Sequence, residues 1–228
     1  MKPILFNTEM VKAIMEGKKT VTRRIIKKTN NKDFIGFVTC SVPKGDEGKV
    51  AFGRGSLEDI GNANIDEYVR PPYKVGDILY VRETWCKDGE SYFFKADTDM
   101  DEAIIYMAIN DLKWKPSIHM PKEAARIFLK VTNVRVERLQ DITEEGAIKE
   151  GIRAYTKDEK VYNYALNEEQ YPWIVMPREP ITPFCKLWNS TIKKDQLNKY
   201  SWQANPWVWV TEFERIEKGN ENNEKNNC

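Results

Sequence analysis

The segment that most constrains the fold is WVWVTEF, residues 207–213, near the end of the chain. Alternate residues of an extended chain point to opposite faces, so a period of two predicts a β-strand. We expect one face to carry Trp207, Trp209, Thr211 and Phe213, and the other to carry Val208, Val210, Glu212 and Glu214. The sequence therefore predicts a regular strand as its last ordered element.

Several other short runs predict strands, because they are rich in β-branched residues or alternate in character. These runs cover residues 2–6, 20–26, 34–40, 49–52, 78–85, 91–95 and 127–136. We expect the run at 91–95 to be the hairpin partner of the run at 78–85. The long run at 127–136 slips in its alternation, which indicates a bulge near Asn133.

Three segments predict short helices, because apolar residues recur in them at helical spacing or because a cap precedes them. We expect the first helix to be capped by Asn7 or Thr8 and to end at Gly17. We expect Asp141 or Thr143 to cap the second helix. The third helix is expected over 182–191, with Pro183 at its first position. Strands and helices do not alternate regularly along the chain. We therefore expect an α+β fold with a mostly antiparallel sheet or a small barrel.

The chain of 228 residues suits one domain that carries insertions. We expect a single domain over residues 1–215, interrupted by excursions at about 30–72 and 155–179. The first excursion is rich in glycine, and the second carries little regular pattern. The polar, Asn-rich residues at 216–228 predict a disordered tail.

The near balance of charge limits what composition says about function. The net charge is +1, although 31% of the residues are charged. Bulk charge therefore does not mark a nucleic-acid-binding protein, and any anion site has to be local. Four cysteines without a C-x-x-C pair and one histidine predict reduced thiols, no metal site and no cofactor. No signal peptide or membrane span is predicted, so we expect a cytoplasmic protein.

The densest local charge is in GKKTVTRR, residues 17–24, which places four cations and two threonines within eight residues. From composition alone, this segment is a solvated helix end followed by an edge strand whose cations deter pairing. The alternative is a site for an anionic or nucleoside-like ligand. The neighbouring sequence motifs favour the second interpretation.

Taken together, these segments resemble the ASCH domain family, whose members have a PUA-like fold. The resemblance is carried by GKKTVTRR after the first helix, by Gly76-Asp77 and the strand leading into RETW at 82–85, by the strand 127–139 and the helix 143–151, and by the strand 207–213. With its PSIHMP and NPWVWV segments, the chain looks most like the ASCH proteins often found in phages and prophages. The resemblance implies a small β-barrel with a few short flanking helices.

One branch of the family is a compact bacterial amidohydrolase that removes the acetyl group from N4-acetylcytidine with a Lys, a Thr and a Glu. Carried over by motif, these residues fall on Lys19, Thr22 and Glu150, with Glu145 and Glu144 as alternatives for the carboxylate. The resemblance implies that Thr22 is the nucleophile, Lys19 its base, and Glu150 a proton shuttle to the leaving amine.

A regular strand would keep Lys19 and Thr22 apart, because residues three positions apart point to opposite faces. The two side chains can meet only if Lys19 still lies in the turn after Gly17, or if the strand bulges. Arg24 in the same segment would stabilise an oxyanion or contact a phosphate.

Further candidates for ligand binding share a positive charge, a hydroxyl group or an aromatic ring. They are Lys18, Thr20, Arg23 and Arg24, then Arg82 and Trp85 of RETW, and Ser117 and His119 of PSIHMP. Trp85 would stack on a base, although core packing explains a tryptophan there equally well. A lone histidine such as His119 is more often structural than catalytic.

Two functions therefore compete. One is a non-catalytic module that binds RNA or a modified nucleoside in a basic cleft, and the other is an amidohydrolase for an N4-acylated cytidine. A ribonuclease, as among some family members, fits less well with one histidine and no carboxylate cluster. The chain is much longer than the compact enzyme, and its two excursions can reshape the cleft, so a larger or different ligand stays open. No membrane partner is expected.

Overall fold

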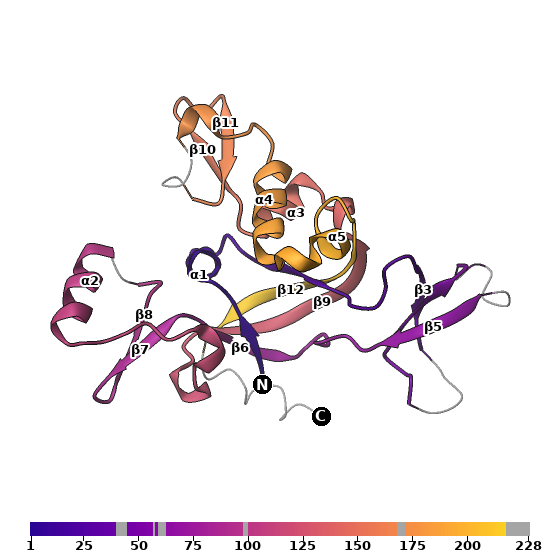
Figure 1. Cartoon of the computed structure of the whole chain (residues 1–228), viewed down its shortest axis with the longest axis horizontal. Helices are drawn as coiled ribbons and strands as arrows, with labels where there is room; N and C mark the ends of the chain where they lie inside the picture. The colour runs from indigo at the N-terminus through magenta and orange to yellow at the C-terminus, as the bar shows by residue number, and fades with distance from the viewer. Residues whose placement is uncertain (40–44, 57, 59–62, 98–99, 168–171, 218–228) are drawn as a thin grey trace, which may run out of the picture.

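A computed structural model describes residues 1–39, 45–56, 58, 63–97, 100–167 and 172–217, with the side chains of 100–104 excepted. Its central feature is a five-stranded sheet of order β1–β6–β9–β12–β2 (Figure 1). These strands are β1 (Lys2–Leu5), β6 (Ile78–Arg82), β9 (Phe128–Arg138), β12 (Trp207–Ile216) and β2 (Val21–Ile25). Strand β1 runs parallel to β6, and the other neighbours are antiparallel. The strands and short helices confirm the α+β class.

The two longest strands, β9 and β12, form an antiparallel ladder through the middle of the sheet. Its register shifts where Glu212 pairs with Asn133 and Phe213 pairs with Val131, so Thr132 is an extra residue on β9. This is the β-bulge expected near Asn133. A bulge of this kind bends the strand that carries it and increases its local twist.

The side chains of β12 do not keep a strict period of two. Phe213 packs in the main cluster with Val208 and Val210, whereas Trp209 packs in another cluster with Phe52. The expectation that Phe213 shares a face with Trp209 is therefore wrong. The register shift beside Phe213 is the irregularity that accompanies this change of face.

The first helix, α1 (Thr8–Met15), follows β1 directly. The Asn7 side chain caps it by accepting a hydrogen bond from the backbone N–H of Met10 at 2.9 Å. The chain leaves the helix through Gly17, whose φ of +72° lies in the left-handed region that glycine adopts most readily. Both ends of this helix are as the sequence predicts, and of the two expected caps it is Asn7, not Thr8, that caps the helix.

Three further helices gather on one side of the sheet (Figure 1). They are α3 (Glu144–Lys149), α4 (Ile181–Thr191) and α5 (Leu197–Tyr200). Thr143 caps α3 by accepting from the N–H of Gly146 at 3.0 Å, so Thr143 is the cap and Asp141 is not. Helix α4 begins two residues before Pro183. Proline is tolerated there because first-turn N–H groups have no partner within the helix.

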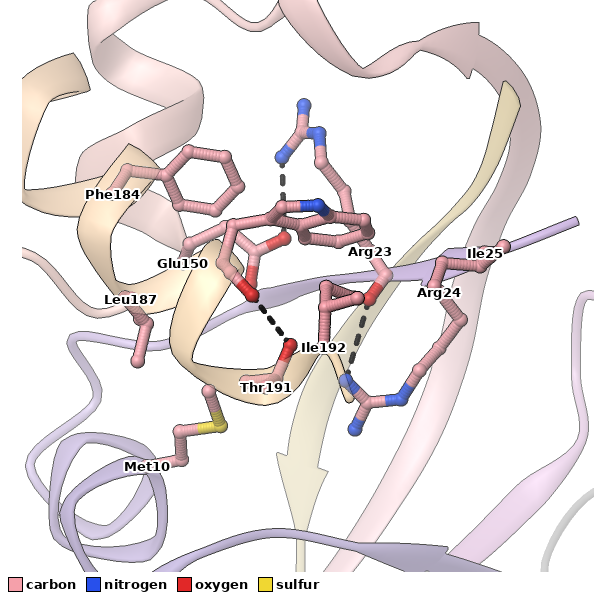
Figure 2. Close-up of a pocket in the computed structure, with 10 residues that line it drawn as sticks. Met10, Arg23, Arg24, Ile25, Glu150, Phe184, Leu187, Thr191 and Ile192 are labelled. Carbon is pink, nitrogen blue, oxygen red and sulfur yellow. Dashed lines mark hydrogen bonds and ion pairs between the residues drawn. The ribbon is translucent and has the colours of Figure 1, made fainter. Parts of the chain in front are cut away.

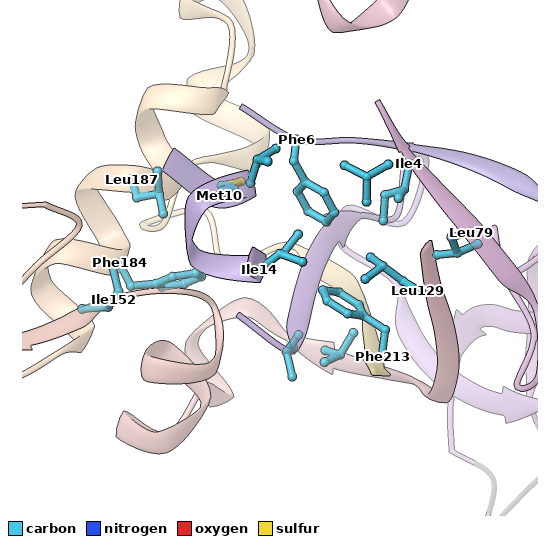
Figure 3. Close-up of a cluster of buried hydrophobic side chains, with 14 of the residues drawn as sticks. Ile4, Phe6, Met10, Ile14, Leu79, Leu129, Ile152, Phe184, Leu187 and Phe213 are labelled. Carbon is cyan, nitrogen blue, oxygen red and sulfur yellow. The ribbon is translucent and has the colours of Figure 1, made fainter. Parts of the chain in front are cut away.

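The main core lies between the central sheet and the helices α1 and α4 (Figure 3). Leu79 and Leu129 come from the sheet, Ile14 from α1 and Phe184 from α4, and none is more than 2% exposed. Burial of a side chain of this size contributes about 1.5–3 kcal/mol. This packing fixes the helices relative to β2, the strand that carries the basic segment.

The first excursion, 30–72, folds into a three-stranded antiparallel sheet that extends away from the central sheet (Figure 1). Its strands are β3 (Asp33–Phe37), β4 (Val50–Arg54) and β5 (Asn64–Val69). Strand β5 is not among those that the sequence predicts. Trp207 anchors this sheet, because its ring lies 5.8 Å from that of Phe34 and 6.0 Å from that of Phe52.

Two other hairpins branch from the chain. One consists of β7 (Trp85–Asp88) and β8 (Ser91–Phe94) and is followed by α2 (Met100–Ile109); the other consists of β10 (Arg153–Thr156) and β11 (Tyr162–Ala165). Short 3₁₀ helices lie at Ser117–His119, Lys122–Ala124, Leu139–Asp141, Trp173–Val175 and Lys194–Gln196. The expected pairing of 78–85 with 91–95 holds only at its end. Trp85 pairs with Phe94, and the N–H of Lys95 donates to the carbonyl of Thr84, but the strand breaks after Arg82 and β8 pairs with β7.

The edge strands of the central sheet are β1 and β2. Among the described residues, no backbone ladder joins them, so the pairings give an open sheet. A side chain spans the gap instead, since Arg24 Nη2 donates to the carbonyl of Leu5 at 3.0 Å. Strand β12 ends at Ile216, the first residue of the expected tail, and 218–228 lie outside the described residues. No helix within the described ranges has the length and apolar character to cross a membrane.

Candidate functional site

The basic segment begins in a turn after α1. The backbone N–H groups of Lys18 and Lys19 both donate to the carbonyl of Ala13, at 2.8 and 3.0 Å. Strand β2 starts only at Val21. Lys19 therefore belongs to the turn and not to the strand, which is the condition under which Lys19 and Thr22 can approach each other.

The side chain of Lys19 is fully buried, with 0% of its surface exposed. Its Nζ donates to the carbonyl of Val21 at 2.7 Å, to the carbonyl of Glu150 at 2.8 Å and to Glu150 Oε2 at 2.6 Å. An ammonium group has three hydrogens, so these acceptors satisfy it completely. The Val21 carbonyl belongs to the peptide bond that leads into Thr22, and Nζ therefore lies beside the backbone of Thr22.

The end of α3 fits closely around this lysine. Gly151 follows Glu150 with a φ of +105°, and a Cβ at that position would lie 3.3 Å from Ala13 Cβ and 3.7 Å from Lys19 Cβ. Both the backbone angle and the limited space favour glycine. Gly151 thereby lets the end of α3 approach the end of α1, and this approach brings Glu150 to Lys19.

The Glu150 carboxylate is shared by two cations. Oε2 accepts from Lys19, and Oε1 accepts from Arg23 Nη1 at 3.3 Å. The other terminal nitrogen of Arg23 donates to Glu137 of β9 at 3.2 Å. Arg23 is buried along with Glu150, so the site contains a network of paired charges that is largely removed from water.

The alternative carboxylates, Glu144 and Glu145, lie elsewhere. Both are exposed in the first turn of α3, and Glu145 pairs with Lys149 at 2.6 Å. The first turn of a helix favours negative charge, which accounts for their position. The structure therefore brings Glu150, and neither alternative, to Lys19.

Thr22 lies in β2 opposite Thr211 of β12 and is 1% exposed. Its Oγ1 has no hydrogen-bond partner among the described residues. Leaving a buried hydroxyl without a partner costs about 1–3 kcal/mol, so its presence calls for an explanation. Lys19 does not supply the partner, because its three hydrogens go to other acceptors.

Burial lowers the pKa of Lys19 below its ordinary value, because the charged form loses its hydration. Glu150 opposes this shift, and the guanidinium groups of Arg24 and Arg23 reinforce it. The net direction is downward. The neutral amine is therefore easier to reach at Lys19 than at an exposed lysine, and Glu150 Oε2 is positioned to receive the proton.

A cavity of about 250 Å³ opens beside this network. Arg23, Arg24, Glu150 and Thr191 form its polar wall, and the apolar wall consists of Met10, Ile25, Phe184, Leu187, Trp188 and Ile192. Figure 2 shows the two arginine side chains diverging, with Arg23 meeting Glu150 and Arg24 extending away from it. Lys19 and Thr22 do not line the cavity, so they lie behind this polar wall.

Arg24 differs from its neighbours in its partners. Nη1 donates to the carbonyl of Arg23 at 3.3 Å and Nη2 to that of Leu5 at 3.0 Å. The guanidinium also lies 5.4 Å from the centre of the Phe6 ring. Within the described part of the chain, no carboxylate lies within 4.0 Å of Arg24. This half-buried cation therefore lines the cavity with no anion of the described residues in direct contact, although the Glu150 carboxylate still attracts it from farther away.

The other candidates of the basic segment lie outside the cavity. Lys18 is exposed and pairs with Glu16 at 2.8 Å. Thr20 is half-buried, and its backbone links α3 to β12 by donating to Lys149 and accepting from Phe213. Neither side chain contributes to the cavity wall.

The RETW and PSIHMP residues meet one another and do not reach the cavity. Arg82 Nε donates to the carbonyl of Met120 at 2.7 Å. Trp85 is 6% exposed and packs with Met120, so it offers no ring face to a base, and core packing describes it. Ser117 is half-buried and His119 is exposed, both in a short 3₁₀ helix. None of these residues lines the cavity.

The apolar wall is the part of the site that the motifs did not predict. Phe184, Leu187 and Trp188 come from α4 and recur at the spacing of a buried helix face. That spacing predicts burial but does not distinguish a cavity wall from an ordinary core contact. Glu137, which holds Arg23 from β9, carries no sequence signal at all.

Within the described ranges, no group of three His, Cys, Asp or Glu side chains is placed to hold a metal ion. Cys86 and Cys185 are free thiols, and Cys40 and Cys228 lie outside the described residues. Comparison of the chain with protein-family models, with curated proteins and with solved structures gave no match. The geometry of the site and the residues of the motifs are therefore the basis for assigning a function.

Proposed function

We propose that this chain is a PUA-like protein of the ASCH type that binds RNA or a nucleoside in the cavity beside Arg23, Arg24 and Glu150, and that it hydrolyses an N4-acylated cytidine at Thr22, which the acyl group reaches once the wall formed by Arg23 and Glu150 moves aside. The observation that carries the proposal is the buried, unpartnered hydroxyl of Thr22 next to the peptide carbonyl that holds Lys19 Nζ. A hydroxyl, an amine of lowered pKa and a carboxylate are the groups that such a hydrolysis requires.

The barrel is supported by the edges of the central sheet. A sheet closes into a barrel when its edge strands approach each other. The bond from Arg24 of β2 to the Leu5 carbonyl of β1 spans these two edges. The free thiols of Cys86 and Cys185 suit the reducing cytoplasm, which is the location we propose for a phage-type or prophage-type ASCH protein.

The reaction begins with a proton transfer inside the buried pair. Lys19 Nζ passes a proton to Glu150 Oε2 across 2.6 Å, which leaves a neutral amine and a carboxylic acid. The lowered pKa of Lys19 favours this step. The amine then has a lone pair for the proton of Thr22 Oγ1. Contacts of this kind are often long before a ligand binds and tighten in the complex.

The acyl transfer then follows in two stages. Thr22 Oγ1 attacks the acyl carbonyl carbon and gives its proton to Lys19, and the Nε–H of Arg23, which has no partner among the described residues, is the donor available to the oxyanion that forms. The bond from carbon to N4 breaks, and N4 takes a proton from the Lys19–Glu150 pair and leaves as the amine of cytidine. Water next attacks the ester on Thr22 and gives its proton to Lys19. The bond from the acyl carbon to Oγ1 then breaks, Oγ1 takes the proton back from Lys19, and the carboxylic acid is released.

A second function, binding without hydrolysis, is favoured by one observation. All three hydrogens of Lys19 Nζ are engaged and none is directed to Thr22, which is the state expected of a structural ion pair. In that case the cavity would hold RNA or a nucleoside through its arginines alone. A ribonuclease has no supporting group in the cavity, because its polar wall supplies a single carboxylate and no histidine.

The deciding experiment is hydrolysis of N4-acetylcytidine by the purified protein, followed as cytidine release. Thr22→Val removes the hydroxyl and keeps the shape, and it should abolish turnover. Thr211→Val is the matched control, because Thr211 is equally buried and pairs with Thr22 across the strands. No turnover by the folded wild-type protein would exclude this substrate and leave the binding module.

A further inference from the structure

The site contains more positive charge than its carboxylates neutralise. Glu150 pairs with both Lys19 and Arg23. The second partner of Arg23, Glu137, is itself shared with Arg135, and Arg135 also pairs with Glu212. Arg24 adds a further cation on the cavity wall. The protein's own described side chains therefore leave positive charge at the cavity uncompensated.

Arg23 Nε is a buried donor without a partner among the described residues. Arg24 has further free donors on the cavity wall. A guanidinium group has five N–H donors in a planar fork, and the contacts to Arg23 and Leu5 use two of them, both toward neutral carbonyls. Such a fork matches the paired oxygens of a phosphate or carboxylate. A half-buried arginine also binds an anion more strongly than an exposed one does, because water competes less.

The wall opposite this charge is apolar and partly aromatic. Phe184, Leu187 and Trp188 from α4 contribute it. A ligand that fills the cavity therefore needs two parts, namely a flat or apolar body for this wall and an anionic group for Arg24. A free nucleoside provides only the first part and leaves Arg24 without a counter-ion.

We propose, on the basis of the function proposed above, that the ligand is a cytidine nucleotide and not a free nucleoside, with a phosphate bound by Arg24 and the base lying against the α4 wall. The phosphate can belong to a mononucleotide or to an RNA chain, since both present the same oxygens. The competing role of Arg24 is structural, because it also holds the Leu5 carbonyl and lies over the Phe6 ring.

The test measures binding of cytidine, cytidine 5′-monophosphate and a cytidine RNA trimer to the full-length protein by calorimetry. We expect the monophosphate or the trimer to bind at least about tenfold more tightly than cytidine, as one charge-assisted bidentate contact provides. Arg24→Gln should bring this ratio close to one, because it removes the phosphate contact. Lys27→Gln, which removes an exposed cation just after β2, is the control and should keep the ratio.

The possible results distinguish a failure of the nucleotide inference from a failure of the proposed function. Equal affinity of the wild type for cytidine and both phosphorylated ligands overturns the nucleotide inference and leaves nucleoside recognition intact. An equal loss of affinity for every ligand in Arg24→Gln also overturns it, because a structural role predicts that pattern. No binding of any ligand overturns the proposed function and the inference with it. Tighter binding of the trimer than of the monophosphate supports the inference and assigns the phosphate to RNA.

Discussion

Lys19 Nζ lies 2.6 Å from Glu150 Oε2, and neither side chain is more than 5% exposed. The two residues are 131 positions apart in the sequence, and their contact joins the turn after α1 to the end of α3. A buried ion pair costs desolvation, so it is weak evidence for stability as such. Because the ion pair lies beside the backbone of Thr22, we propose that it takes part in proton transfer to and from the Thr22 hydroxyl.

The buried pair should be coupled energetically. Lys19→Met and Glu150→Met each leave one charge buried without this partner, and each should lower the free energy of unfolding by about 3–5 kcal/mol. The double variant should lose less than the sum, by about 1 kcal/mol or more, because residues in contact are not additive. Urea denaturation of the four proteins measures this coupling. Strict additivity would show that the two side chains do not interact in solution.

The contribution of Lys19 to stability should increase with pH. Burial lowers its pKa in the folded protein, so between that value and the ordinary value of about 10.4 the unfolded chain binds more protons. Stability rises with pH wherever the unfolded state binds more protons. The free energy of unfolding of the wild type minus that of Lys19→Met should therefore grow from neutral pH toward about pH 10. A difference that shrinks over this range would mean that Glu150 raises the pKa of Lys19 above its ordinary value.

Thr22→Val should stabilise the protein while it removes activity. The hydroxyl of Thr22 is buried without a partner, and its replacement by a methyl group should recover about 1 kcal/mol of the 1–3 kcal/mol penalty. For a chain of this size the melting temperature should rise by about 2–4 °C. A melting temperature that falls in Thr22→Val would show that the hydroxyl has a partner in the folded protein.

Gly151→Ala should disturb the position of Glu150. Gly151 has a φ of +105°, which is strained for other residues, and a new Cβ would press against Ala13 at 3.3 Å. A loss of about 1–3 kcal/mol is expected. Gly89→Ala is the control for the backbone alone, because Gly89 also has a positive φ, of +55°, but no atom within 4 Å of the added Cβ. An equal loss in both variants would argue against close packing at the end of α3.

The sequence predicts the regular parts of this fold well. The period of two in β12 and the alternation slip in β9 are local properties, and the structure has the strand and the bulge where these patterns place them. Strand β5 and helix α2 are not predicted. Exposed and half-buried residues alternate along β5, so its sequence has no strong apolar pattern. The strand is held by its pairing with β4, which a local pattern does not reveal.

The candidate site is predicted only in part. Lys19, Thr22 and Arg24 fall within one motif, but the sequence leaves open whether Lys19 approaches Thr22, because that depends on Lys19 lying in the turn after Gly17. The contact of Glu150 with Lys19 depends on how α3 packs against α1. The sequence alone does not distinguish Glu150 from Glu144 and Glu145 as the carboxylate that meets Lys19. The apolar wall of α4 is a tertiary property, because a helix face of that spacing packs against whatever the fold places beside it.

The central claim is that Thr22 carries the acyl group during hydrolysis. The most direct measurement is mass spectrometry of a rapidly quenched reaction with N4-acetylcytidine, followed by mapping of any acetyl group to a peptide. If Thr22 is the nucleophile, the wild type releases cytidine and has one acetyl group on the peptide that contains Thr22. Thr22→Val then shows neither cytidine release nor the acetylated peptide. Cytidine release that persists in Thr22→Val, or an acetyl group on a different peptide, would contradict the central claim.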